Sequence, residues 1–230
     1  MEKPLIATPV APEDAARRIV AAYVVKFGHP PTREEAELLT ALVFLENAHG
    51  AAVIQHNWGN VSTFVKPTVD YWRPPWFDLD KVNALPDGPK KNHLLFEHAE
   101  MVAHRAPSAF LAFDSHEQGL RSWLANVKPS MYEAARQGDP MGFAHANWSS
   151  GYCPDDACKN SGPTFARLQA DIRNAGYFAT LTPGAPANAS AGAGEAGTSA
   201  PPKDLFDVAV TVGIALGMAL LAETFGTPPK

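Results

Sequence analysis

The sequence predicts a mainly α-helical domain of the α+β class with a short irregular β region, followed by a linker and a C-terminal apolar helix. Three observations carry this prediction. Apolar residues recur at helical spacing between capping signals over residues 12–178. A Pro- and Trp-rich stretch, residues 57–90, interrupts that pattern with short β-prone runs. Beyond residue 181 the composition changes to small residues and then to an uncharged run.

The first two helices are marked by their end residues. Pro12 opens a helix that we expect to run to Phe27, because Pro is favoured in the first helical turn. Thr32 and Glu35 have the spacing of a capping box for a second helix. That helix is so apolar that we expect it at the centre of the core. Glycines that can end helices follow three of the predicted segments: Gly28, Gly50 and Gly176.

The middle of the chain predicts one or two short strands and several further helices. Val61 to Val65 is a β-prone run inside the Pro- and Trp-rich stretch. Further helices are expected over His93–Arg105, after the capping boxes Ser115/Gln118 and Ser130/Glu133, after Asp139-Pro140, and over Pro163–Asn174.

Composition excludes several classes of protein. The 230 residues carry a formal net charge of −5, which argues against a nucleic-acid partner. Two cysteines supply neither a disulfide framework nor a four-cysteine zinc site. Cys153 and Cys158 form a disulfide or remain reduced, and the sequence leaves both open. Residues 1–12 have no long apolar run, so we expect no secretory signal there.

The chain divides into three parts: residues 1–181 as the folded domain, 182–203 as a flexible Ala/Gly/Pro linker, and 204–230 as a hydrophobic, membrane-seeking helix. We expect residues 205–225 to enter a membrane, since Val208 to Ala222 carries no charge. Burial in an assembly or against the domain is the alternative. Gly213 and Gly217 form a G-x-x-x-G pair that would permit self-association.

The residues best suited to chemistry lie between Leu38 and Ser62. Glu46 sits late in the strongly apolar second helix, where desolvation raises a carboxyl pKa and keeps the group protonated. A protonated carboxyl is what a general acid for glycosidic cleavage requires. The turn that follows offers an aromatic ring, a glycine and two amides suited to a sugar: Asn57, Trp58, Gly59 and Asn60. A solvated or capping Glu and a core Trp are the alternatives.

These motifs resemble the bacterial and phage endo-β-N-acetylglucosaminidases that cut peptidoglycan, in the lysozyme-like superfamily. Leu45-Glu46-Asn47 is similar to the family's helix-ending catalytic Glu motif, and Asn57-Trp58-Gly59 to its following turn. The resemblance continues in order over residues 32–175. Its later segments are Phe110–Ser115, Gly138–Pro140, Gly151-Tyr152 and Phe165–Leu168.

The resemblance implies a lysozyme-like fold and cleavage of β-1,4 bonds in peptidoglycan glycan strands, without a cofactor, by Glu46 as general acid. It implies that Tyr152 lines the substrate cleft, and Trp148 nearby is cleft or core. The second carboxylate would be Asp70, Asp78 or Asp80, with Asp80 favoured. Without it, the substrate's acetamido group would assist, or the enzyme would be a lytic transglycosylase.

A further expectation concerns the biological setting. A lysin in a phage virion or in the bacterial envelope fits the apolar tail, and the rival is a non-catalytic virion or membrane assembly protein that binds glycan.

Four polar residues of one predicted helix have the spacing of metal ligands. They share one helical face: His93, Glu97, Glu100 and His104. A solvated polar stripe explains that pattern better, so no metal is expected.

Overall fold

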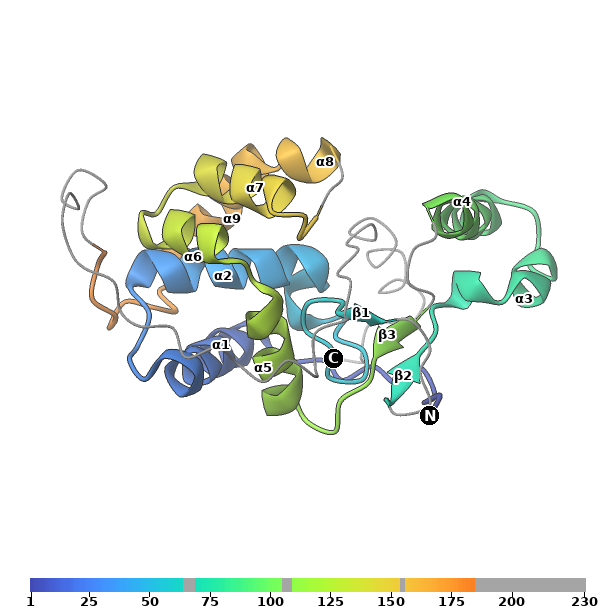
Figure 1. The fold of residues 1–230 in the computed structure, drawn as a ribbon, viewed down its shortest axis with the longest axis horizontal. Coiled ribbons are helices and arrows are strands. Elements are labelled where there is room, and N and C mark those ends of the chain that lie inside the picture. Colours follow the sequence, from blue (N-terminus) through green and yellow to red (C-terminus); the bar gives the residue numbers. More distant parts are fainter. Residues whose placement is uncertain (64–68, 105–108, 154–155, 185–230) are drawn as a thin grey trace.

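The structure is a computed structural model that describes residues 1–63, 69–104, 109–153 and 156–184 (Figure 1). Most of the linker, the 204–230 helix, and Gly213 and Gly217 lie outside the described residues. The described part is mainly helical. Its α-helices are α1 (Pro12–Phe27), α2 (Arg33–Glu46), α3 (Leu79–Asn83), α4 (Pro89–His104), α5 (His116–Asn126), α6 (Pro129–Arg136), α7 (Pro140–Ser149), α8 (Asp156–Lys159) and α9 (Gly162–Asn174).

The first two helices begin as the sequence predicts. α1 starts at Pro12 and is ended by Gly28, whose φ of 75° is the left-handed conformation that glycine favours. The capping box of α2 is confirmed. The Thr32 side chain accepts a hydrogen bond from the Glu35 backbone, and the Glu35 carboxylate accepts one from Thr32 N at 2.9 Å.

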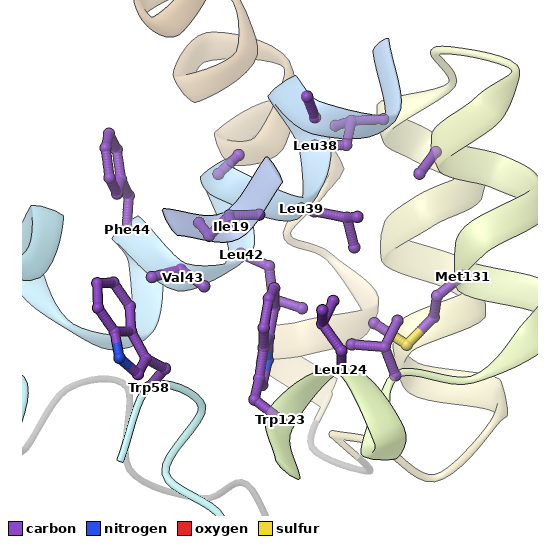
Figure 2. Packing of buried hydrophobic residues seen from close by; sticks show 14 of the residues in the cluster. Ile19, Leu38, Leu39, Leu42, Val43, Phe44, Trp58, Trp123, Leu124 and Met131 are labelled. Atoms are coloured by element: carbon purple, nitrogen blue, oxygen red, sulfur yellow. The ribbon is translucent and has the colours of Figure 1, made fainter. Parts of the chain in front are cut away.

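Helix α2 is the central element of the larger core. It packs against α1, α6 and α9, and Figure 1 shows it enclosed by these helices. Its buried apolar residues contact Trp58, Trp123 and residues of the surrounding helices (Figure 2). The buried Glu37 carboxylate accepts hydrogen bonds from Gln169 Nε2 at 3.2 Å and Arg173 Nε at 3.0 Å, which attaches α9 to α2. The catalytic candidate therefore stands at the end of a firmly held helix.

Besides a one-residue difference at the start of α9, three predicted helix boundaries are wrong. α4 begins at Pro89 rather than at His93, and Pro is favoured in the first turn. α2 ends at Glu46 rather than near Gly50, because the chain turns into a 3-10 segment, η1 (Ala48–Gly50), in which His49 has a φ of 60°. Ser130 does not cap α6. The helix begins one residue earlier, at Pro129, with Lys128 as its N-cap. The caps at Ser115 and Asp139 are confirmed.

The β region is small and has its own apolar core. Strands β1 (Ser62–Thr63), β2 (Tyr71–Trp72) and β3 (Ala109–Leu111) form an antiparallel sheet in the order β1-β3-β2. Trp72 stacks on Phe110, with the ring centroids 4.8 Å apart. A second 3-10 segment, η2 (Pro75–Phe77), and α3 pack on α4. The described part thus has a helical lobe around α2 and a smaller lobe around the sheet (Figure 1).

The membrane expectation concerns residues that the structure leaves undescribed. Within the described ranges, no helix combines the length and apolar character needed to cross a bilayer. Residues 205–225 fall outside those ranges.

Candidate active site

Glu46 is the last residue of α2, at the point where the chain leaves the helical lobe for the β region. Its side chain is buried, with only 2% of the residue exposed. Within the described residues, no positively charged group is among the interactions that shift the pKa of its carboxyl. Burial therefore raises the pKa of the Glu46 carboxyl to about 8, although a hydrogen bond from Tyr152 acts in the opposite direction. The predicted pKa shift is confirmed in direction.

One carboxylate oxygen of Glu46 is held by a chain of two aromatic donors. The Trp123 Nε1–H donates to the Tyr152 hydroxyl at 2.9 Å, and that hydroxyl donates to Glu46 Oε1 at 3.1 Å. An indole nitrogen only donates, so the single proton of the tyrosine hydroxyl is directed at Glu46. Both aromatic residues are buried. The pair fixes the orientation of the carboxyl group.

The second oxygen of Glu46 has a different environment. Oε2 is buried and has no hydrogen-bond partner within the described part of the chain. With Oε1 accepting from Tyr152 and the pKa near 8, the proton of the neutral acid belongs on Oε2. A buried carboxylic acid with a free O–H can donate a proton to a leaving-group oxygen.

The turn after α2 supports Glu46 from the backbone side. The Asn57 amide donates to the carbonyls of Val61 and Leu111, both at 3.0 Å, and its oxygen accepts from Val61 N at 2.8 Å. Asn60 Nδ2 donates to the Glu46 carbonyl at 3.3 Å, and Asn47 Nδ2 donates to the Trp58 carbonyl. These amides link the end of α2 to the start of the sheet.

The sugar-binding assignment of this turn needs correction. The Trp58 side chain is fully buried in the larger core, so it is not a surface platform for a sugar ring. Asn57 and Asn60 are also buried, and their amides bond to protein backbone. Gly59 does permit a close approach, but of the Trp123 ring, which a Cβ at this position would strike. The four residues build the support of the site, and the structure shows no substrate-facing surface on them.

A histidine completes the packing around Trp58. Trp58 Nε1 donates to His116 Nδ1 at 3.2 Å, and the His56 ring meets His116 edge-on with centroids 4.4 Å apart. Burial, followed by the nearby His56 and Arg18, lowers the pKa of His116 to about 4. His116 therefore stays neutral at neutral pH, and its Nδ1 accepts the hydrogen bond from the Trp58 indole N–H.

The structure does not bring a second carboxylate to Glu46 from the three candidates. Asp80 is exposed on α3, whose main contacts are with α4 and η2. Asp78 caps α3 and pairs with Lys81 at 2.9 Å. Asp70 pairs with Lys3 at 2.9 Å, which lowers its pKa. The preference for Asp80 thus finds no support in its position.

The remaining predicted residues lie around the end of α7. Cys153 and Cys158 form a disulfide, with their Cα atoms 6.0 Å apart, so the bonded alternative holds here. Trp148 is half-buried, and the Lys159 ammonium lies 4.5 Å from its ring centroid. Tyr152 is buried and contacts Glu46 through its hydroxyl, so it belongs to the same site, and its place in a substrate cleft stays a prediction.

Sequence reasoning missed Trp123 and Asn147. Trp123 lies on the buried face of a predicted helix, and nothing in local spacing indicates that its indole reaches a tyrosine 29 positions away. Asn147 is buried on α7, and its Oδ1 has no partner within the described residues. An amide inside an apolar helix was the available signal, because a buried amide needs a partner.

A metal centre is not formed by the parts of the chain that are described, where no three His, Cys, Asp or Glu side chains gather. His93 Nε2 lies 3.9 Å from Glu97 Oε1, while the side chains of Glu100 and His104 are outside the described set.

The chain was compared with protein-family models, with curated proteins and with solved structures. None of the three comparisons finds a match.

Proposed function

We propose that this protein cleaves the β-1,4 glycan strand of peptidoglycan, with Glu46 as the general acid. The observation that carries the proposal is the state of that carboxyl: it is buried, its pKa is raised to about 8, one oxygen is held by Tyr152, and the other has no hydrogen-bond partner among the described residues. Such a group is neutral at pH 7 and oriented, as proton donation to a glycosidic oxygen requires. The ordered motif resemblance over residues 32–175 supplies the substrate class.

The proposed step begins with transfer of the Oε2 proton to the leaving-group oxygen. Positive charge then develops at the anomeric carbon and needs support. Since none of the three aspartate candidates is positioned beside Glu46, the substrate's own acetamido oxygen is the group we assign to that task. Closure onto a sugar hydroxyl instead of attack by water would make the enzyme a lytic transglycosylase.

Purified peptidoglycan in a turbidity assay tests the activity, with wild type, Glu46→Gln and Glu133→Gln. Gln keeps the size of Glu46 but has no acidic proton, so a loss of at least about 100-fold is expected. Glu133 is an exposed carboxylate that pairs with Arg136, and its variant is the matched control. Full activity in Glu46→Gln contradicts the site. Mass spectrometry of the fragments distinguishes glucosaminidase, muramidase and transglycosylase products.

The 2% exposure of Glu46 favours one rival, a non-catalytic protein that binds glycan with the same domain. Such a protein sediments with peptidoglycan and leaves its turbidity unchanged in wild type. Either function suits a virion-associated or membrane-tethered protein of the bacterial envelope, which is the setting that we propose from the apolar tail.

A further inference from the structure

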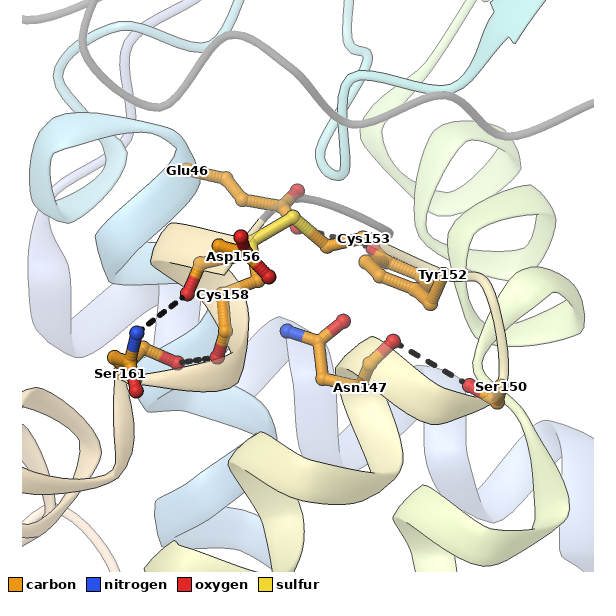
Figure 3. Close-up of a disulfide and its surroundings, with 9 residues drawn as sticks. Glu46, Asn147, Ser150, Tyr152, Cys153, Asp156, Cys158 and Ser161 are labelled. Atoms are coloured by element: carbon orange, nitrogen blue, oxygen red, sulfur yellow. Dashed lines mark hydrogen bonds between the residues drawn. A yellow bond between two sulfur atoms is a disulfide. The ribbon is translucent and has the colours of Figure 1, made fainter.

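One cysteine of the disulfide directly follows Tyr152, the residue whose hydroxyl holds the Glu46 carboxyl. Tyr152 bonds to Glu46 Oε1, and the next residue, Cys153, is bonded to Cys158. Figure 3 draws the Glu46 side chain, Tyr152 and the disulfide together at one end of α7. Tyr152 and Cys153 are 1% and 2% exposed, so both side chains belong to the interior.

The other half of the disulfide is anchored to the helix that packs on α2. The Cys158 carbonyl accepts hydrogen bonds from Ser161 Oγ at 2.6 Å and Ser161 N at 3.2 Å (Figure 3). Ser161 is the N-cap of α9, and α9 is attached to α2 through Glu37. A closed path of contacts therefore runs from α2 through Glu46, Tyr152 and the disulfide to α9 and back to α2.

Opening the disulfide breaks this path next to Tyr152. The chain after α7 also contains Gly151, which has a φ of 75° and around which a Cβ would meet no other atom. Glycine has the greatest backbone freedom, so this position does not stiffen the chain. The Cys153 backbone N–H to Asn147 carbonyl bond, at 3.1 Å, remains after reduction. Hydrogen bonds of this kind restrain the neighbouring phenol less than a covalent link does, because each contributes only about 1 kcal/mol net.

The two sulfurs differ in access. Cys158 is half-buried on α8, a short helix in which no residue is buried, whereas Cys153 is buried. A thiolate reagent therefore attacks Sγ of Cys158. The S–S bond breaks, the electron pair leaves on Cys153 Sγ, and that sulfur takes up a proton. The second thiol of a dithiol reagent then releases Cys158, so two electrons and two protons pass to the protein.

We propose that the Cys153–Cys158 disulfide is the positioning element of the general acid, acting through Tyr152, and that a dithiol reductant switches the site to a less active form. Cys153 and Cys158 do not touch the substrate in this proposal. The catalytic consequence rests on the proposed function of Glu46, but the coupling between the disulfide and Tyr152 does not.

The test uses the full chain in its oxidised form, after dithiothreitol treatment, and as the Cys153→Ser/Cys158→Ser double variant. The first readout is the NMR signal of the Trp123 indole N–H, assigned by its loss in Trp123→Phe. That proton bonds to the Tyr152 hydroxyl, so it reports the position of Tyr152 without any substrate. The second readout is the pH profile of peptidoglycan cleavage.

Three results are expected together. The Trp123 indole signal moves on reduction and in the double variant. The rate of cleavage falls at least about tenfold, and the basic limb of the pH profile of cleavage moves. Dithiothreitol has no effect on the double variant, which controls for reduction elsewhere, and the circular dichroism spectrum stays helical.

An unchanged indole signal and an unchanged profile in the reduced wild type overturn the proposal, whatever the double variant does. If the oxidised protein itself cleaves nothing, the proposed function fails, and the indole signal alone still decides the coupling. A moved indole signal with an unchanged pH profile and rate also overturns the positioning role, because the phenol would then move without affecting the acid.

Discussion

At the residue scale, the buried acid has a cost in folding stability. The pKa of Glu46 is about 8 in the folded protein against an ordinary value of 4.5. Below pH 4.5 the group is protonated whether the chain is folded or not, so its contribution to folding is fully present. As pH rises toward 8, the unfolded chain ionises and the folded one does not, and stability falls.

Glu46→Gln should therefore stabilise the protein at pH 8 and have little effect on its stability at pH 4.5. The folded-state shift corresponds to about 5 kcal/mol at its limit, and relaxation around the charge reduces it, so a gain of about 2 kcal/mol is expected. Denaturant unfolding at both pH values measures this. Equal gains at both values would place the cause outside the ionisation of Glu46.

Tyr152→Phe separates the hydroxyl from the ring. The hydrogen bond from Tyr152 lowers the pKa of Glu46, so its removal moves that pKa upward from about 8. An acid catalyst must be protonated, and the basic limb of the cleavage profile should move to higher pH by about half a unit. The rate at pH 6 should fall about tenfold, since Oε1 loses its only fixed donor within the described residues. A limb that moves down in pH contradicts this account.

The raised pKa of Glu46 could be predicted because it depends on the apolar helix around it, and the ordered resemblance assigned Tyr152 to the same site. It misplaced Trp58, because an aromatic ring before a glycine is compatible with both a sugar platform and a core. The complete burial of Trp58 in the larger core decides between them. Local spacing in the sequence does not predict contacts between residues far apart in the chain. For that reason Trp123 and Asn147 were not found.

At the element scale, the turn over residues 57–60 is the support on which the end of α2 rests. Its amides bond to the Glu46 carbonyl and to β3, and Gly59 lets the Trp123 ring lie against the backbone. This arrangement makes the turn intolerant of added volume although it lies outside any long helix or strand. The same ring donates to Tyr152, so disturbance at Gly59 reaches the acid.

Gly59→Ala should destabilise the fold by about 2–3 kcal/mol and lower cleavage at least as much as Tyr152→Phe does, because the new methyl group overlaps the Trp123 ring. Gly88→Ala is the matched control, since a Cβ there meets open space. Thermal unfolding and the turbidity assay measure both variants. Equal stability of the two would show that Trp123 does not lie against Gly59.

Helix starts were predicted best where the residue at the start acts through a single local interaction. The Thr32/Glu35 capping box, Pro12 and Asp139-Pro140 each gave the correct helix start, because side-chain caps and a Pro in the first turn act locally. The prediction from Ser130 failed because Pro129 is the first residue of the helix and Lys128 its N-cap, two residues before the predicted cap. The end of α2 failed because backbone conformations at Ala48 and His49 are set by packing rather than by glycine.

At the scale of the whole molecule, the site lies where two apolar cores meet. α2 belongs to the helical lobe, and the chain passes directly from Glu46 through the 57–60 turn into the sheet. The carboxyl is thereby buried and held by Tyr152 in the helical lobe, and the backbone carbonyl of Glu46 is bonded by Asn60 of the turn that leads to the sheet. The pattern of helices and short strands predicted a mainly helical domain with a short β region, but not its division into two apolar cores. It did not give the positions of Asp70, Asp78 and Asp80, which depend on how the smaller lobe folds.

The apolar tail carries the prediction that concerns localisation. Residues 205–225 contain an uncharged run bounded by Asp207 and Glu223, and the linker before it gives the tail independence from the domain. We therefore expect the full chain to float with liposomes in a density gradient and a chain lacking 204–230 to remain at the bottom. Cleavage of soluble glycan fragments should be equal in the two, because Glu46 and the residues that hold it lie in the described part of the chain before the linker.

A charged substitution in the tail distinguishes insertion of the tail into the membrane from adhesion of the linker to its surface. Ala215→Lys places an ammonium near the centre of the uncharged run, where a charge costs about 3 kcal/mol in a bilayer, and should reduce flotation strongly. Ala191→Lys, in the linker, is the matched control and should float as wild type does. If Ala215→Lys floats unchanged, the tail does not enter the apolar part of the bilayer. Its uncharged face is then better explained by contact with protein, for which Gly213 and Gly217 allow close approach of a second helix.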